Sequence, residues 1–243
     1  MTFKTNIAQY ETATGDKLLY PFGPPIFQCE VDEKFTKDLI EEGRKLDIKN
    51  NDFSSNLAGN LKYGRSYHYK KEFTLKAENY LQNYVKRFEK GLTSQFQMYR
   101  DKDFTGWAKL IERQDSLSEH YNPGDLRGKN KKRAGIVRLD SLWVNFSKKH
   151  DYNPPHTHSG ILSFVIFCKI PNKIFSVQAD SNAQKAGYIV FQYGVETKLS
   201  GVEYPIKPYE NLMFIFPADL SHYVPGFWVD EERITVSGNF VAL

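Results

Sequence analysis

Three of the six histidines stand where their spacing suits metal binding. His156 and His158 are two residues apart, and residues i and i+2 of an extended chain project to the same face. Pro154 and Pro155 come directly before them and restrict the backbone to extended conformations. Both imidazoles can therefore approach one ion, on a stretch of chain stiff enough to hold them in place.

His222 is the third candidate ligand, and it opens a later predicted strand. Two ligands from one strand and a third from another build a facial site, which leaves coordination positions open for substrate and oxygen. Imidazole ligands suit iron, among other transition metals. A H-x-H pair is also common among histidines that only pack or face solvent, so the metal site needs a further observation to support it.

Arg233 and Thr235 supply that observation, because they share one face of the strand that follows His222. A guanidinium binds a carboxylate through two parallel hydrogen bonds, and a neighbouring hydroxyl adds another. The pair predicts an anchor for the distal carboxylate of a small acid beneath the metal. The alternative is that Arg233 pairs at the surface with the acidic run 230–232, an interaction that contributes little.

The elements that must position these residues are strands. From about residue 135 onward, short apolar runs alternate with Gly, Pro, Asn and Asp, which is typical of strands and their turns. Aromatic residues, 15% of the chain, also favour strands. The predicted strands are 135–147, 161–170, 187–193, 202–207, 211–216, 222–228 and 233–242. Many short strands at this spacing predict a sandwich, a jelly roll or a cupin-like barrel.

The N-terminal part has a helical pattern instead. Residues 18–31 are predicted to be extended, and a helix capped by Asp32 is predicted over 33–46. A second helix is predicted over 74–93, with Thr74 at its start and Gly91 at its end. We expect residues 1–134 to support a catalytic core formed by 135–243, within one integrated domain.

Residues 113–134 are the main irregular stretch and contain a basic run over 127–133. A surface loop and a mobile lid beside the site are both compatible with it. The run would suit an acidic partner, but a stretch with five such charges usually forms a solvated face. The net charge of +4 is too small to indicate nucleic-acid binding.

The remaining composition excludes several other classes of protein. Cys29 and Cys168 are far apart and form no metal-binding pair, so neither a zinc ribbon nor a disulfide scaffold is expected. No signal peptide and no run of about 18 apolar residues is present, so we expect a soluble cytoplasmic chain without a membrane partner. Nothing in the sequence marks a subunit interface.

Four short stretches around the candidate ligands form an ordered set of motifs. They are Trp143-Val-Asn145, Asn153-Pro-Pro-His156-Thr-His158-Ser-Gly160, Phe216-Pro217 followed by His222, and Glu232-Arg233-Ile-Thr-Val-Ser237. The set resembles the 2-oxoglutarate/Fe(II) oxygenases related to the prolyl 4-hydroxylases, many of which occur in marine phages and bacteria. Residues 19–26 and 56–60 extend the likeness over most of the chain.

The resemblance implies a mainly β fold with packed helices, namely a double-stranded β-helix with helices on one sheet. It also implies that His156 and His222 bind iron and that Arg233 binds the cosubstrate carboxylate, with Thr235 beside it. Related enzymes usually have Asp or Glu where this chain has His158. His158 is still expected to be the third ligand, with Asp151 as the nearest alternative carboxylate.

The implied activity is that of an Fe(II)- and 2-oxoglutarate-dependent dioxygenase. Such an enzyme would hydroxylate a C–H bond of a peptidyl, amino-acid or other small substrate and release succinate and CO2. Asn145 is a candidate donor to the carboxylate of 2-oxoglutarate that chelates iron. A phage-encoded chain would act in the host cytoplasm. Two alternatives stay open: a three-His cupin-type iron enzyme that does not use 2-oxoglutarate, and a non-catalytic β-barrel binding module.

Overall fold

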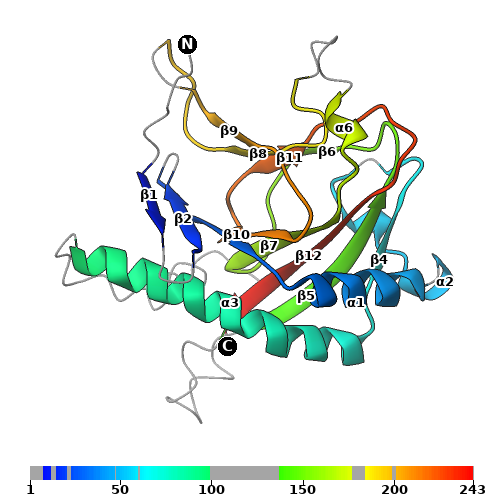
Figure 1. Cartoon of the computed structure of the whole chain (residues 1–243), viewed down its shortest axis with the longest axis horizontal. Coiled ribbons are helices and arrows are strands. Elements are labelled where there is room, and N and C mark those ends of the chain that lie inside the picture. The colour runs from blue at the N-terminus through cyan, green and yellow to red at the C-terminus, as the bar shows by residue number, and fades with distance from the viewer. Residues whose placement is uncertain are drawn as a thin grey trace.

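A computed structural model describes residues 8–11, 15–20, 23–46, 48–59, 61–98, 137–176, 184–198 and 201–242. Within these ranges, two antiparallel sheets face each other, and two long helices cover the outer face of the larger sheet (Figure 1). The basic run 127–133, the surrounding stretch 113–134 and His120 lie outside the described residues.

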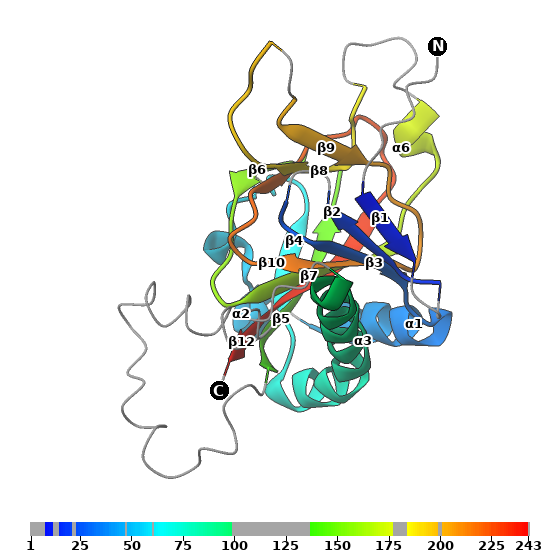
Figure 2. The same cartoon turned by 90° about the vertical axis from the view of Figure 1, so that its left-hand side faces the viewer.

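The larger sheet has eight strands in the order β1-β2-β3-β10-β7-β12-β5-β4. These strands are β1 (Ala8–Glu11), β2 (Lys17–Tyr20), β3 (Ile26–Glu30), β4 (Arg65–His68), β5 (Val137–Ser147), β7 (Leu162–Lys169), β10 (Leu212–Pro217) and β12 (Arg233–Ala242). The smaller sheet has four strands in the order β6-β11-β8-β9. They are β6 (Asn153–His156), β8 (Ile189–Gln192), β9 (Glu203–Ile206) and β11 (His222–Val224). Figure 2 shows the two sheets from the side.

The strands from β5 to β12 pass back and forth between the two sheets. β5, β7, β10 and β12 lie in the larger sheet, and β6, β8, β9 and β11 lie in the smaller one. This winding is that of a double-stranded β-helix, or jelly roll, and it confirms the predicted fold class. The described strands do not close into a barrel, because the edges of β10 and β5 pair with β3 and β4 instead of with the smaller sheet.

The two predicted helices are present, and one is longer than expected. α1 (Glu33–Arg44) begins as predicted, with the Asp32 carboxylate accepting a hydrogen bond of 2.8 Å from the Lys34 N–H. α3 (Lys71–Met98) starts earlier and ends later than 74–93. Thr74 donates its hydroxyl to the Lys70 carbonyl, as a residue inside a helix does. Gly91 does not adopt the positive φ of a glycine that ends a helix.

Several short elements were not predicted. Besides the strands β1, β4 and β6, they are α2 (Ile48–Asn51), a 3₁₀ turn at Ser54–Asn56 and α6 (Lys173–Ser176). Elements of three or four residues are too short to show a period in the sequence. No helix in the described ranges is both long and apolar enough to cross a bilayer.

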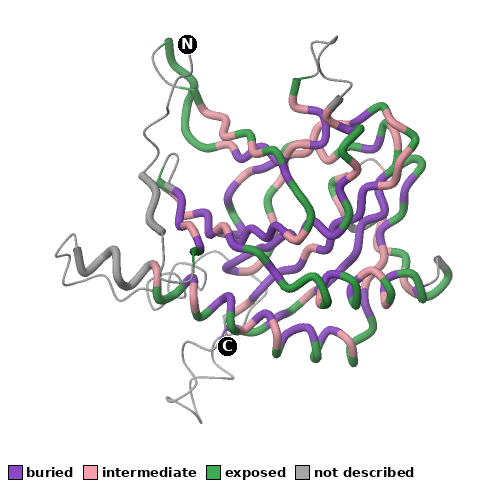
Figure 3. The backbone as a smooth tube through the Cα atoms, viewed as in Figure 1, coloured by how far each residue is buried: buried purple, intermediate pink, exposed green. Residues whose placement is uncertain are grey.

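The central strands of the larger sheet are mostly buried, as the purple stretches of the tube in Figure 3 show. Its outer face packs on α1 and α3 through residues such as Leu39, Phe88 and Val144. Its inner face packs against the smaller sheet through residues such as Phe167 and Phe191. Every residue of β7 from Leu162 to Cys168 is buried, and both free cysteines are buried as well. The chain therefore has a helix-side layer that supports the sheet and an inner layer that can hold a site.

The docking of α3 on the sheet is testable at Phe88, whose side chain is 0% exposed and lies 5.7 Å from the Phe27 ring of β3, measured between centroids. Phe88→Ala should lower the free energy of unfolding in urea by about 3–5 kcal/mol, because it leaves a cavity. Leu75→Ala, on the same helix but 48% exposed, should change it by less than about 0.5 kcal/mol. Equal effects would contradict this packing.

Candidate metal centre

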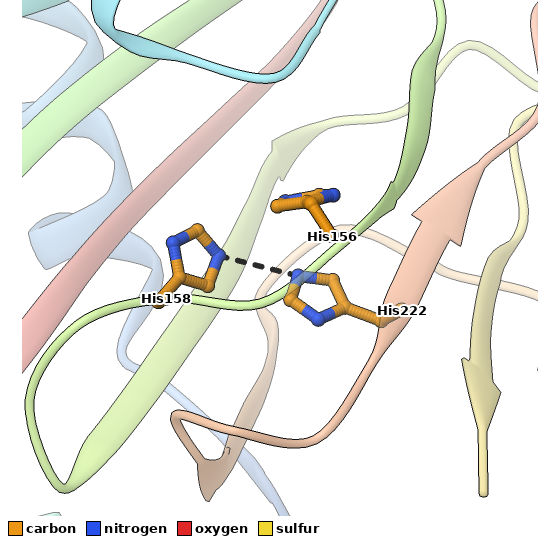
Figure 4. A group of neighbouring side chains, drawn as sticks. All are labelled: His156, His158 and His222. Atoms are coloured by element: carbon orange, nitrogen blue, oxygen red, sulfur yellow. Dashed lines mark hydrogen bonds between the residues drawn. The ribbon is translucent and has the colours of Figure 1, made fainter. Parts of the chain in front are cut away.

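The three candidate histidines meet between the sheets. Their ligand atoms lie within 4.8 Å of one another, and the three rings turn toward a common point (Figure 4). His156 ends β6 and His222 begins β11, and the two are paired across these neighbouring strands. Their ring centroids are 4.4 Å apart, and His158 lies 4.9 Å from His156 and 5.1 Å from His222. The three residues are thus placed as the ligands of one ion would be.

His158 reaches the cluster by a different route from the one that its spacing predicts. β6 ends at His156, so His158 is not part of a continuous strand. Its backbone N–H donates to the Ala218 carbonyl at 2.8 Å, in the turn that follows β10. This contact with a distant turn, rather than alternation along a strand, brings the His158 ring beside His156.

Backbone carbonyls fix which nitrogen of two histidines faces the cluster. His156 Nδ1 lies 2.8 Å from the Pro154 carbonyl oxygen, and His222 Nδ1 lies 3.0 Å from that of Leu220. A carbonyl only accepts, so Nδ1 carries the proton and Nε2 keeps its lone pair.

The Nε2 atoms of His158 and His222 are close enough to bind the same ion. His158 Nε2 and His222 Nε2 are 3.3 Å apart, as the dashed line in Figure 4 marks. Two nitrogens each about 2.1 Å from an ion are about 3.0 Å apart when they meet it at a right angle. Because His222 Nδ1 carries its proton, His158 Nε2–H donates this hydrogen bond in the metal-free chain; a cation would replace that proton and be bound by both lone pairs.

Burial keeps the three imidazoles neutral. It lowers the pKa of His156, lowers the pKa of His158 to about 4, and lowers the pKa of His222 well below its ordinary value. The neighbouring imidazoles lower the pKa of His158 and His222 further, because two cations so close would repel. Neutral imidazole is the form that binds metal.

Asp151 is not a member of the cluster. Its buried carboxylate accepts hydrogen bonds from the Lys148 N–H at 2.8 Å and the Tyr63 N–H at 3.1 Å. These bonds tie the segment before β4 to the turn after β5. Asp151 therefore has a structural role here, and the third member of the cluster is His158.

Arg233 is a buried cation. Its side chain is 4% exposed, and the guanidinium carbon lies 5.4 Å from the centre of the Phe167 ring. Burial lowers the pKa of Arg233 to about 10, which still leaves the group charged at neutral pH. Within the described part of the chain, Arg233 Nε has no hydrogen-bond partner. A buried charge without a partner is costly, so the guanidinium is poised for an anionic ligand.

The acidic run before Arg233 does not neutralise it. Its three members bind other cations: Asp230 binds Lys149, Glu231 binds Lys173, and Glu232 binds Arg44. The alternative of a surface ion pair for Arg233 is therefore wrong. Arg233 is paired with Ser147 across β12 and β5. Its side chain points into the space between the sheets, where it lines the pocket.

One pocket between the sheets joins the predicted residues. It is lined by the three histidines and by Asn145, Arg233 and Thr235. Asn145 and Thr235 are paired across β5 and β12, and the Asn145 amide donates to the Thr235 hydroxyl at 3.4 Å. The six residues named from the sequence thus share one cavity.

The rim of the pocket includes residues that the site prediction did not name. Leu57, Ala58 and Gly59 line it, and a Cβ atom on Gly59 would overlap the side-chain oxygen of Asn153 on the same rim. Ser66 lies behind the pocket and donates to the Asn145 side chain. The motif at 56–60 could have indicated the rim of the pocket, whereas no motif near Ser66 indicates a role for that residue.

The lowered histidine pKa values predict how the metal-free chain responds to acid. Below about pH 6.5 the unfolded chain protonates its histidines, while His158 and His222 stay neutral in the folded chain. Stability should therefore fall between pH 6.5 and 5, by up to about 1.4 kcal/mol per pH unit for each such histidine. Urea unfolding across this range measures the slope, and His222→Gln should make it shallower. A flat profile in the wild type would count against neutral buried imidazoles.

Known proteins were compared with the chain as family models, as curated sequences and as solved structures. Residues 141–239 match the family model described as "Putative 2OG-Fe(II) oxygenase". No curated protein matches the chain. The range matched contains all six residues of the candidate site.

Solved structures with some likeness include two hydroxylases. A Pseudomonas putida prolyl-4-hydroxylase has a TM-score of 0.45 and 10% identity, over 90% of this chain and 92% of that one. The viral collagen prolyl hydroxylase of Paramecium bursaria Chlorella virus-1 has a TM-score of 0.43 and 9% identity, over 90% and 96%. Similarity at this level carries no argument about substrate. The family match confirms the resemblance: residues 141–239, which hold the six predicted site residues, are similar to the 2OG-Fe(II) oxygenase family.

Proposed function

We propose that the chain is an Fe(II)- and 2-oxoglutarate-dependent dioxygenase that hydroxylates a C–H bond of its substrate. The observation that carries the proposal is the presence of a buried, unneutralised guanidinium in the same pocket as three neutral imidazoles. The imidazoles suit a divalent metal, and the guanidinium suits a carboxylate. A small ligand that has both a chelating end and an anionic end would satisfy both groups.

The residues of the pocket fit both Fe(II) and 2-oxoglutarate. His156, His158 and His222 would hold Fe(II), and three protein ligands leave positions open for cosubstrate and oxygen. When bound, Fe(II) and 2-oxoglutarate supply the oxidising chemistry, in which O2 converts the cosubstrate to succinate and CO2 while the substrate gains a hydroxyl group. The protein supplies binding, orientation and shielding.

The side chains of the larger sheet would bind and shield the cosubstrate. Arg233 would bind its distal carboxylate and Thr235 would donate to it, while Asn145 would donate at the chelating end. Phe167 and Val165 form apolar walls that exclude water from these polar contacts. Exclusion of water strengthens each charged interaction inside the pocket.

The substitution of His158 for a carboxylate changes the charge of the site. A carboxylate ligand would cancel part of the metal charge, whereas three neutral imidazoles cancel none of it. Together with Arg233, the loaded metal therefore presents a strongly positive pocket. That charge favours a dianion such as 2-oxoglutarate over a neutral or singly charged ligand.

The primary substrate is proposed to be a peptidyl or free amino-acid side chain. This part rests on the resemblance of the sequence motifs to prolyl 4-hydroxylase-related enzymes. A panel of prolyl, lysyl and asparaginyl peptides and the free amino acids, assayed for a mass gain of one oxygen, would test it. Succinate release that none of them stimulates would contradict this substrate class and leave the dioxygenase proposal standing.

The proposed activity is tested by adding Fe(II) and then 2-oxoglutarate without oxygen. A visible charge-transfer band should appear, and succinate should be released when air is admitted. No band would contradict the proposal. Iron binding without a response to 2-oxoglutarate would instead support a three-His iron enzyme of the cupin type. No metal binding would support a non-catalytic binding module.

His158 can be tested as a ligand separately from catalysis. His158→Ala should abolish tight Fe(II) binding in an anaerobic titration, because two imidazoles remain, whereas His158→Asp should preserve it by restoring a carboxylate. His150→Asn is the control, since His150 is exposed with φ of 71° and Asn tolerates that conformation. Tight binding by His158→Ala would remove His158 from the ligand set.

Arg233→Met should separate stability from cosubstrate binding. Met fills similar space without a charge, so the metal-free chain should become more stable by about 1 kcal/mol or more. Affinity for 2-oxoglutarate, followed through the charge-transfer band, should fall by about 100-fold or more, while Fe(II) affinity is kept.

Arg138→Met is the matched control for that variant, because Arg138 is bound to Glu78 away from the pocket. It should lose stability and keep its affinity for 2-oxoglutarate. Unchanged affinity in Arg233→Met would overturn the assigned carboxylate anchor.

A further inference from the structure

A chain of buried hydrogen bonds crosses three neighbouring strands and ends in the pocket. The Ser66 hydroxyl on β4 donates to the Asn145 side-chain oxygen on β5. The Asn145 amide nitrogen then donates to the Thr235 hydroxyl on β12 at 3.4 Å. The three residues stand opposite one another in the strand pairing, and all three are buried.

Ser66 decides which way the Asn145 amide faces. The oxygen and nitrogen of a side-chain amide have nearly the same shape, so their hydrogen-bond partners determine the orientation. With Ser66 donating to the oxygen, the amide nitrogen faces Thr235 and the pocket.

Ser66 is itself held firmly by the backbone around it. Its N–H donates to the Ser54 hydroxyl at 3.1 Å, and its carbonyl accepts from the Phe53 N–H at 2.9 Å. Its side chain is 0% exposed and is not part of the pocket lining. It can therefore act on a ligand only through Asn145.

The orientation of the Asn145 amide determines whether the Thr235 hydroxyl accepts a hydrogen bond from it or donates one to it. Because Thr235 accepts from Asn145, its own proton is free to be donated into the pocket, where Arg233 also presents donors. If the amide turned over, Thr235 would donate back to Asn145 and present a lone pair to the ligand. A carboxylate only accepts, so it would lose a donor and meet a repelling oxygen.

We propose that Ser66 is a positioning residue for the carboxylate of the cosubstrate, acting through Asn145 and Thr235 so that the pocket presents donors. The inference rests on the proposed function, since it takes 2-oxoglutarate as the carboxylate. It adds to the site a residue from β4, a strand outside the double-stranded β-helix.

The test measures 2-oxoglutarate affinity of the anaerobic, Fe(II)-loaded full chain through the charge-transfer band. Ser66→Ala should weaken the affinity by about tenfold, and Ser66→Cys, which keeps a weak donor, should fall between it and the wild type. Fe(II) affinity should be unchanged in both. Thr235→Val should also weaken 2-oxoglutarate binding, and adding Ser66→Ala to it should have little further effect.

Ser163→Ala is the matched control. The buried Ser163 hydroxyl donates to the Asn239 side-chain oxygen at 2.8 Å, between β7 and β12, and neither residue lines the pocket. This variant should lose stability, as Ser66→Ala does, and keep its affinity for 2-oxoglutarate.

The outcomes separate this inference from the proposed function. A wild-type band with unchanged affinity in Ser66→Ala would overturn the positioning role alone. Independent, additive losses in Ser66→Ala and Thr235→Val would overturn the route through Thr235. The absence of a band in the wild type would overturn the proposed function, and this inference with it.

Discussion

The buried positive charge of Arg233 is the constraint around which the inner layer of the structure is arranged. A guanidinium removed from water is costly unless an anion is near, and the acidic residues next to it in the sequence are bound to Lys149, Lys173 and Arg44. The chain keeps this charge on β12, between β5 and β7, in the pocket that the three histidines share. The carboxylate of the proposed cosubstrate would offset that cost.

The register of the larger sheet places Arg233 on the pocket side of β12. Along β12, Arg233, Thr235 and Ser237 line the pocket, while Ile234 and Val236 join the core on the helix side. A slip of one residue would exchange the two sets and place the charge among the helices. The pairing of β12 with both β5 and β7 holds the register, and the packing of α1 and α3 supports it. Stability of the helix-side layer and chemistry of the inner layer thus depend on the same strand.

Much of this arrangement could be predicted from the sequence, because it is local. The strands after residue 135, the Asp32 cap and the stiff approach to His156 all follow from neighbouring residues. The contribution of β4 could not be predicted, because Ser66 acquires its role only through pairing with Asn145, far along the chain. His158 was predicted as a ligand, but the Ala218 carbonyl that positions it could not be predicted. The partners of Asp151 could not be predicted either, because only the folded chain brings them together. The open barrel likewise follows from edge pairing by β3 and β4, which no local pattern encodes.

One pocket is proposed to bind a metal through three histidines and an anion through Arg233. A crystal structure of the chain grown with Mn(II) and 2-oxoglutarate, with the metal placed from its anomalous signal, tests it most directly. We expect the metal on His156, His158 and His222 and the distal carboxylate within hydrogen-bond distance of Arg233. A metal bound elsewhere, or a cosubstrate whose carboxylate leaves Arg233 unpaired, would contradict it.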